Sequence, residues 1–130
     1  MTVCVGYVRT GEGRAALGFA IRECTVRSDQ LLVVVTEEVA ATAEFAADLA
    51  LAEASLRQRG VEVRTVGSDN NAASELIDLS YEDTTDLLVI GLRRRSPAGK
   101  LVMGSTSQQV LLAAGCPVTA VKAPVQPART

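Results

Sequence analysis

The sequence predicts a single α/β domain built on a parallel β-sheet, and three observations support that prediction. The chain has 130 residues, of which 48% are apolar, which suits one ordinary domain with a real core. Apolar runs alternate along it with stretches in which apolar residues recur at helical spacing. The strongest runs are unbroken and partly β-branched, as in strands covered on both faces. Such alternation favours right-handed crossovers and helices on both faces of the sheet.

Five strands and four helices are expected, each from its own pattern. In chain order they are strand 3–8, a helix containing Leu17, Ala20, Ile21 and Cys24, strand 31–35, a helix from Phe45 to Leu56, strand 61–66, a helix from Ala72 to Leu79, strand 87–91, a helix starting near Gly104, and strand 117–121. Gly60 supplies a stop after the second helix. Residues 124–130, which include two prolines, are expected to form a flexible tail after a domain of residues 1–123.

Composition argues against several classes of function. The net charge of −2 and the scarcity of aromatic residues argue against nucleic acid as a partner, and no apolar run is long enough for a membrane span. The chain has no His, which removes Ser-His and Cys-His catalysis, and no catalytic residue or metal site is predicted. Cys4, Cys24 and Cys116 lack paired spacing, so we expect three buried thiols in a reducing cytoplasm.

One connection is unusually long for this kind of fold. Residues 92–103 separate strand 87–91 from the next helix, whereas such loops usually take about 2–6 residues. A long loop at the carboxyl end of a central strand is where open α/β sheets bind ligands. Gly104 and Ser105 open the following helix, whose free N–H groups and dipole favour an anion. The alternative is that Ser105 only caps the helix while Gly104 sets its entry angle.

The segment from Gly91 to Ser107, followed by Cys116-Pro117-Val118, resembles the signature of the universal stress protein family. In nucleotide-binding members that signature reads G-x2-G-x9-G-[ST]. The order of strands and helices along the whole chain is similar as well. The resemblance implies a Rossmann-like, nucleotide α-hydrolase-like fold, a doubly wound five-stranded parallel sheet in the order 3-2-1-4-5.

The resemblance also implies a site for ATP or another adenine nucleotide between the carboxyl ends of the first and fourth strands. The expected residues are Tyr7, Val8, Arg9 and Val35 at the adenine end, and Gly91, Arg94, Gly104, Ser105 and Thr106 at the phosphate end. Gly91 is expected to let the ligand approach the strand closely.

Two positions depart from the family pattern. Arg94 replaces the middle glycine of the signature, where its side chain either obstructs the phosphates or clamps them. Val8 stands where binding members carry an Asp that contacts the nucleotide. Two functions therefore compete: a stress-response module that binds an adenine nucleotide, and a member that binds none and acts as a dimeric interaction protein.

A symmetric homodimer through the last strand, from Pro117 to Val121, is implied by the resemblance. The strand supports it, because no charge protects this sheet edge before Lys122. Pairing with a two-fold copy would satisfy the exposed ladder on both subunits. The alternative is that the tail folds back and covers the edge.

Overall fold

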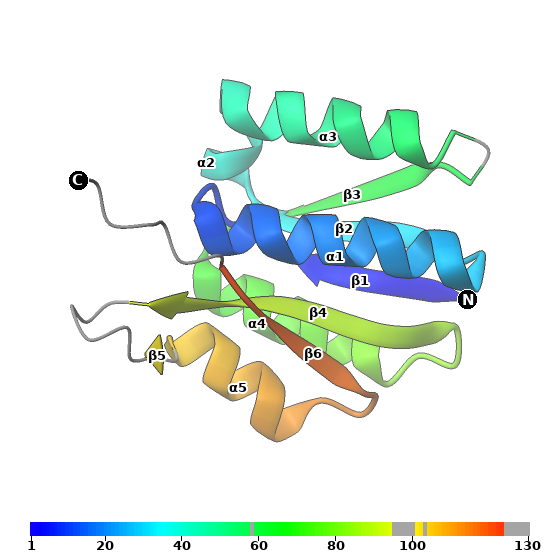
Figure 1. The fold of residues 1–130 in the computed structure, drawn as a ribbon. Coiled ribbons are helices and arrows are strands. Elements are labelled where there is room, and N and C mark those ends of the chain that lie inside the picture. The colour runs from blue at the N-terminus through cyan, green and yellow to red at the C-terminus, as the bar shows by residue number, and fades with distance from the viewer. Residues whose placement is uncertain (58, 95–100, 103, 124–130) are drawn as a thin grey trace, which may run out of the picture.

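The computed structural model describes residues 1–57, 59–94, 101–102 and 104–123, so the predicted tail at 124–130 lies outside the described residues. Six strands and five helices are seen in that part of the chain (Figure 1). In order they are β1 (Thr2–Gly6), α1 (Gly11–Arg27), β2 (Gln30–Thr36), α2 (Glu37–Ala40), α3 (Ala43–Ser55), β3 (Val61–Val66), α4 (Asp69–Ser80), β4 (Thr85–Arg94), β5 (Leu101–Val102), α5 (Ser105–Ala113) and β6 (Val118–Lys122).

The sheet confirms the predicted fold class and strand order. Strand β1 pairs with β2 and β4, β2 pairs with β3, and β4 pairs with β6, all in parallel. The main sheet therefore runs β3-β2-β1-β4-β6, which is the expected order 3-2-1-4-5 with β6 as the expected fifth strand (Figure 1). Its carboxyl ends lie together at one edge, on the left in that view.

Two features differ from the sequence prediction. The part of the chain that the structure describes has five helices rather than four, because Thr36 accepts a hydrogen bond from the Val39 N–H (3.3 Å) and caps the short helix α2. The connection predicted at 92–103 starts later, because β4 continues to Arg94. There it pairs antiparallel with β5, with Arg93 opposite Val102.

Two helical layers give the sheet a core on each face. Helices α1 and α3 bury one cluster, which includes Val5, Leu17 and Phe45, while α4 and α5 bury the other, which includes Cys4, Leu76 and Val110 (Figure 1). Alternate residues of one strand point to opposite faces, so neighbouring residues of β1 and β2 belong to different clusters. Among the described residues, no helix combines the length and apolarity that crossing a bilayer requires.

The three cysteines are free thiols, as predicted, but they are not equally buried. Cys4 and Cys24 are buried within the two cores, and burial raises the pKa of Cys4 to about 12 and that of Cys24 to about 11. Both thiols are therefore protonated and unreactive at neutral pH. Cys116 is only half-buried, because it lies in the connection between α5 and β6.

The amino edge of the sheet holds a cavity of about 380 Å³, whose lining includes Cys4, Arg59 and Arg64. The Arg59 guanidinium donates to the Cys24 carbonyl oxygen (2.9 Å). The Arg64 guanidinium donates to the carboxylates of Glu75 (2.7 Å) and Glu62 (2.8 Å). Both cations that line this cavity are thus engaged by the protein itself.

A buried acid lies at the same edge, outside the lining of that cavity. Asp29 is only 5% exposed, and its Oδ2 atom has no hydrogen-bond partner among the described residues. Its neighbour Asp86 lies where the register between β1 and β4 shifts, because Thr2 pairs with Thr85 and the next pair skips a residue on β4. Burial, and then the Asp86 carboxyl, raise the pKa of Asp29 above its usual value.

Candidate functional site

A cleft of about 290 Å³ opens at the carboxyl edge of the sheet. It lies at the ends of β1, β2 and β4, where the first turns of α1, α4 and α5 begin. Its lining residues are Gly6, Tyr7, Val8, Glu12, Val34, Asp69, Leu76, Ile90, Gly91, Gly104, Ser105, Thr106 and Ser107. Clefts in this place are the usual ligand sites of doubly wound sheets.

The structure brings most of the predicted site residues together in this cleft. Those that line it are Tyr7, Val8, Gly91, Gly104, Ser105 and Thr106. Arg9 and Val35 do not line it. Val35 belongs to the core under α1 and α3, and the preceding residue, Val34, faces the cleft instead. The side chain of Arg94, which was predicted to clamp or to obstruct the phosphates, lies outside the described residues.

Several lining residues were not predicted from the sequence. Glu12 and Asp69 stand in the first turns of α1 and α4, and Ser107 stands in the first turn of α5. The Ser107 hydroxyl donates to the Gly91 carbonyl oxygen (3.3 Å) and so ties α5 to the end of β4. Their place in the sequence could have indicated them, because the first helical residues after parallel strands gather at the carboxyl edge of the sheet.

The start of helix α5 is open and has no side-chain cap. Gly104 occupies the N-cap position with φ −69° and ψ 160°, a conformation that any residue adopts. A Cβ atom added there would meet nothing within 4 Å, so neither packing nor backbone geometry requires glycine. Ser105 does not cap this helix, because it is its first helical residue. The first N–H groups of α5 therefore face the cleft without a capping side chain.

Helices α3 and α4 show the contrasting arrangement. Thr42 accepts a hydrogen bond from the Phe45 N–H (3.2 Å), and Ser68 accepts one from the Asn71 N–H (3.3 Å). Each of these helix starts satisfies one backbone donor internally. The start of α5, which has no acidic residue in its first turn, remains a place where an anion is favoured.

Gly91 serves the protein in a way that the sequence did not indicate. A Cβ atom at residue 91 would lie 2.5 Å from the Glu12 carbonyl oxygen, and one at Gly13 would lie 1.7 Å from the Val8 carbonyl oxygen. Both glycines are needed so that the first turn of α1 can pack against the ends of β1 and β4. The space that we expected a ligand to use above Gly91 is thus occupied, at least in part, by the Glu12 backbone.

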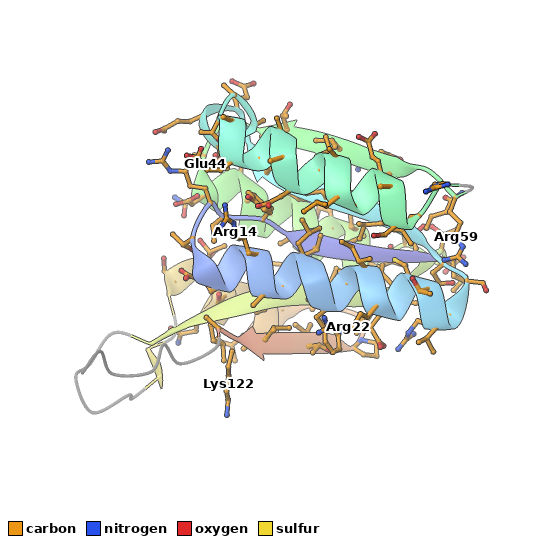
Figure 2. The ribbon with its side chains drawn as sticks, turned by 45° about the horizontal axis from the view of Figure 1, so that its top comes forward. Arg14, Arg22, Glu44, Arg59 and Lys122 are labelled. Atoms are coloured by element: carbon orange, nitrogen blue, oxygen red, sulfur yellow. The ribbon has the colours of Figure 1, made fainter. Side chains whose placement is uncertain are left out.

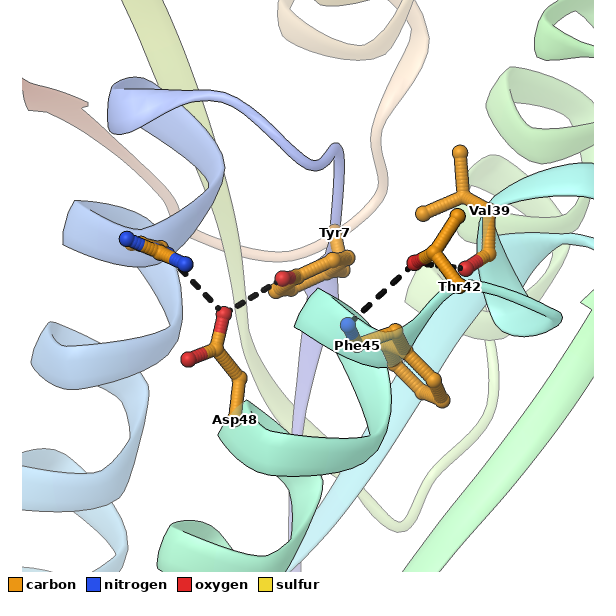
Figure 3. Close-up of polar contacts among 6 residues, drawn as sticks. Tyr7, Val39, Thr42, Phe45 and Asp48 are labelled. Atoms are coloured by element: carbon orange, nitrogen blue, oxygen red, sulfur yellow. Dashed lines mark hydrogen bonds and ion pairs between the residues drawn. The ribbon is translucent and has the colours of Figure 1, made fainter.

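Tyr7 connects the cleft to the opposite face of the sheet. Its hydroxyl donates to the Asp48 carboxylate, and the Arg14 Nε donates to the same oxygen at 3.2 Å (Figure 3). Burial, followed by the Asp48 carboxylate, raises the pKa of Tyr7 to about 12, so the phenol stays a neutral donor. Its ring meets Phe45 edge-on with centroids 5.1 Å apart. Its backbone N–H donates to the Val34 carbonyl oxygen (3.0 Å) and so fixes the wall of the cleft.

Fold and cleft together define a class: a doubly wound α/β protein with an anion-favouring helix start at the carboxyl edge of its sheet. Comparison with known proteins then names the family. The model of the universal stress protein family matches residues 1–122. A universal stress protein of Mycolicibacterium smegmatis (strain ATCC 700084 / mc(2)155) is 39% identical over 92% of this chain and 96% of its own length. The chain belongs to the universal stress protein family, as the signature predicted.

Solved structures agree with this fold. A universal stress protein in complex with cAMP matches with a TM-score of 0.73 and 22% identity, over 95% of this chain and 98% of that one. The universal stress protein of Archaeoglobus fulgidus in complex with dAMP matches with a TM-score of 0.67 and 22% identity, over 94% and 98%. At this level of identity the two likenesses establish the fold alone.

Proposed function

We propose that this protein is a stress-response module that holds ATP or another adenine nucleotide in the carboxyl-edge cleft. The observation that carries the proposal is the uncapped start of α5, where Gly104 leaves open space in front of free backbone N–H groups. The complexes of related proteins with cAMP and dAMP support the same ligand class.

In this proposal the phosphates lie at the start of α5, with the hydroxyls of Ser105 and Thr106 beside them. The base lies toward Val8 and Val34, whose side chains offer apolar contact only. Because the Val8 side chain supplies no hydrogen-bond acceptor, the phosphate end provides most of the affinity. We therefore expect binding that depends strongly on the phosphate.

Thermal denaturation tests the proposal directly. A ligand that binds only the folded state raises the unfolding midpoint by mass action, and at a hundred times Kd the gain is about 2.7 kcal/mol. We expect millimolar ATP, AMP or cyclic AMP to raise the midpoint, and adenosine, which has no phosphate, to raise it much less. No shift with any of the three nucleotides would contradict the proposal.

A second function is favoured by a specific observation. The Glu12 backbone occupies space above Gly91, and Val8 stands in place of the family's Asp, so the cleft lacks one polar anchor. A member that binds no nucleotide and acts as a dimeric interaction protein fits both facts. Saturable calorimetric heats with AMP would exclude this second function.

We also propose a symmetric homodimer through β6. Among the described residues this strand pairs only with β4, and residues 118–121 are half-buried while Lys122 is exposed. Leu111 and Leu112 are exposed on the neighbouring helix α5. Sedimentation equilibrium at micromolar protein should show a dimer, and Ala120→Pro should dissociate it. A wild-type monomer, or a dimer that Ala120→Pro leaves intact, would refute this arrangement.

The proposed role is binding rather than catalysis, in the cytoplasm. Among the described residues no group of three or more His, Cys, Asp or Glu side chains is placed to hold a metal ion. The free thiols suit a reducing compartment. Incubation of the purified protein with ATP should leave the nucleotide unchanged over hours when it is followed by chromatography, and turnover would contradict this role.

A further inference from the structure

We propose that Asp69 selects ligands that carry free ribose hydroxyl groups. This inference rests on the proposed nucleotide function and concerns the same cleft. Asp69 is the first residue of α4, is exposed, and lines the cleft. Its carboxylate makes no hydrogen bond or ion pair with any of the described residues. Among the described residues it is thus an acceptor without a partner.

Of the three helix starts at the cleft, those of α1 and α4 carry an acidic residue, Glu12 and Asp69, and that of α5 carries none. Helices α4 and α5 cover the same face of the sheet, and both begin at the cleft (Figure 1). The start of α5 has no cap and no acidic residue in its first turn, whereas the start of α4 carries Asp69. A phosphate is therefore attracted to the α5 side and repelled from the α4 side. Asp69 suits the part of the ligand that donates hydrogen bonds.

In a nucleotide those donors are the sugar hydroxyls and the amino group of adenine. With the phosphate at α5, the ribose is the next group along the ligand, and the base continues toward Val8 and Val34. The two neighbouring hydroxyls of ribose match the two oxygens of one carboxylate, and such bonds are charge-assisted. In dinucleotide-binding folds, acidic side chains accept hydrogen bonds from ribose hydroxyl groups in this way. The geometry therefore favours the ribose over the base as the partner of Asp69.

A purely structural role for Asp69 has to be separated from this one. An acidic residue in the first turn stabilises a helix through its dipole, and Ser68 already supplies the cap of α4. Glu44 provides a matched control. It stands in the first turn of α3, whose cap is Thr42 (Figure 2), and it is not among the residues that line the cleft. Asp69→Ala and Glu44→Ala should therefore change thermal stability by similar small amounts.

Calorimetric titration with AMP, 2′-deoxy-AMP, 3′-deoxy-AMP and IMP tests the inference. We expect the wild-type protein and Glu44→Ala to bind AMP about tenfold more tightly than either deoxy analogue, since a hydrogen bond to a charged group is worth about that factor. Asp69→Ala should bind AMP and both deoxy analogues with equal affinity. The ratio of AMP to IMP affinity should be the same in all three proteins.

Any other result would contradict either the proposed nucleotide function or the proposed role of Asp69. If the wild-type protein binds none of the four ligands, the proposed nucleotide function is wrong and this inference falls with it. If it binds AMP and the deoxy analogues equally, or if Asp69→Ala keeps the preference, nucleotide binding stands and the role of Asp69 is wrong. If Asp69→Ala instead loses the distinction between AMP and IMP, the carboxylate contacts the base rather than the sugar.

Discussion

The two edges of the sheet contain cavities of different size and opposite character. The cavity at the amino edge is the larger, about 380 Å³ against about 290 Å³, but its arginines are already engaged by Cys24, Glu62 and Glu75. The cleft at the carboxyl edge is smaller, yet it holds an uncapped helix start with open space before it. Polar groups without internal partners, more than volume, distinguish a candidate site from a gap between elements.

The carboxyl edge itself combines a tightly packed part, at Gly13 and Gly91, with an open part at Gly104. Mutations in the two parts should differ in their effect on stability. Gly13→Ala should have the largest effect, because the new Cβ atom would lie 1.7 Å from the Val8 carbonyl oxygen. We expect a loss of about 3 kcal/mol in the free energy of unfolding, measured by urea denaturation. Gly18→Ala on the same helix is the control, since its nearest contact would be the Arg22 side chain at 3.7 Å. It should stabilise the protein by up to about 1 kcal/mol, and equal effects of the two changes would contradict this account.

Gly91→Ala should show the next largest effect, because its Cβ atom would lie 2.5 Å from the Glu12 carbonyl oxygen. The first turn of α1 would have to shift, at a cost of about 2 kcal/mol in the free energy of unfolding. Urea denaturation measures this loss. A stability equal to that of the wild-type protein would show that the contact between α1 and β4 is not tight.

Asp29→Asn tests the amino edge and should stabilise the protein. Burial raises the pKa of Asp29 in the folded state, so the ionised carboxylate opposes folding. This penalty is absent below pH 3.8, the pKa in the unfolded chain, and it appears as the pH rises through the higher pKa of the folded state. An amide removes the penalty and can donate to Asp86. We expect a gain of about 1 kcal/mol at pH 7 that shrinks toward pH 3. A gain that does not depend on pH, or a loss at pH 7, would refute this explanation.

Gly104→Ala should have the smallest effect on stability, because a Cβ atom there meets nothing and the backbone conformation is an ordinary one. We expect a change of about 0.5 kcal/mol or less in the free energy of unfolding. The same change should reduce the rise in unfolding midpoint that AMP produces, since the methyl group occupies the approach to α5. An undiminished rise would place the phosphate elsewhere in the cleft.

Much of the fold could be predicted, because long apolar runs and helical periodicity are local signals. Helix α2 could not, since four residues are too few to show a period and its cap depends on Thr36. The pairing of β4 with β5 was missed because Arg93 and Arg94 have no apolar pattern, and only tertiary geometry brings Leu101 beside them.

In the candidate site, too, some residues could be predicted from the sequence and others could not. Gly91, Gly104 and Ser105 were found from the family signature, and the structure brings them to one cleft. Val35 was chosen in place of Val34, because the residues of a strand covered on both faces look alike in sequence and do not reveal which face meets the cleft. Asp69 was missed because its place depends on the direction in which α4 leaves β3.

Tyr7 belongs to both faces of the sheet at once. Its main chain forms part of the cleft wall, while its phenol is bound to Asp48 on α3 and its ring rests on Phe45 (Figure 3). Asp48 in turn holds Arg14 at the start of α1. A displacement of the β1–α1 turn by a bound molecule would therefore pull on α3 through the bond between Tyr7 and Asp48. In mechanical terms this tyrosine is a linkage through the sheet, by which occupancy of the cleft would reach α3, a helix that contributes no lining residue.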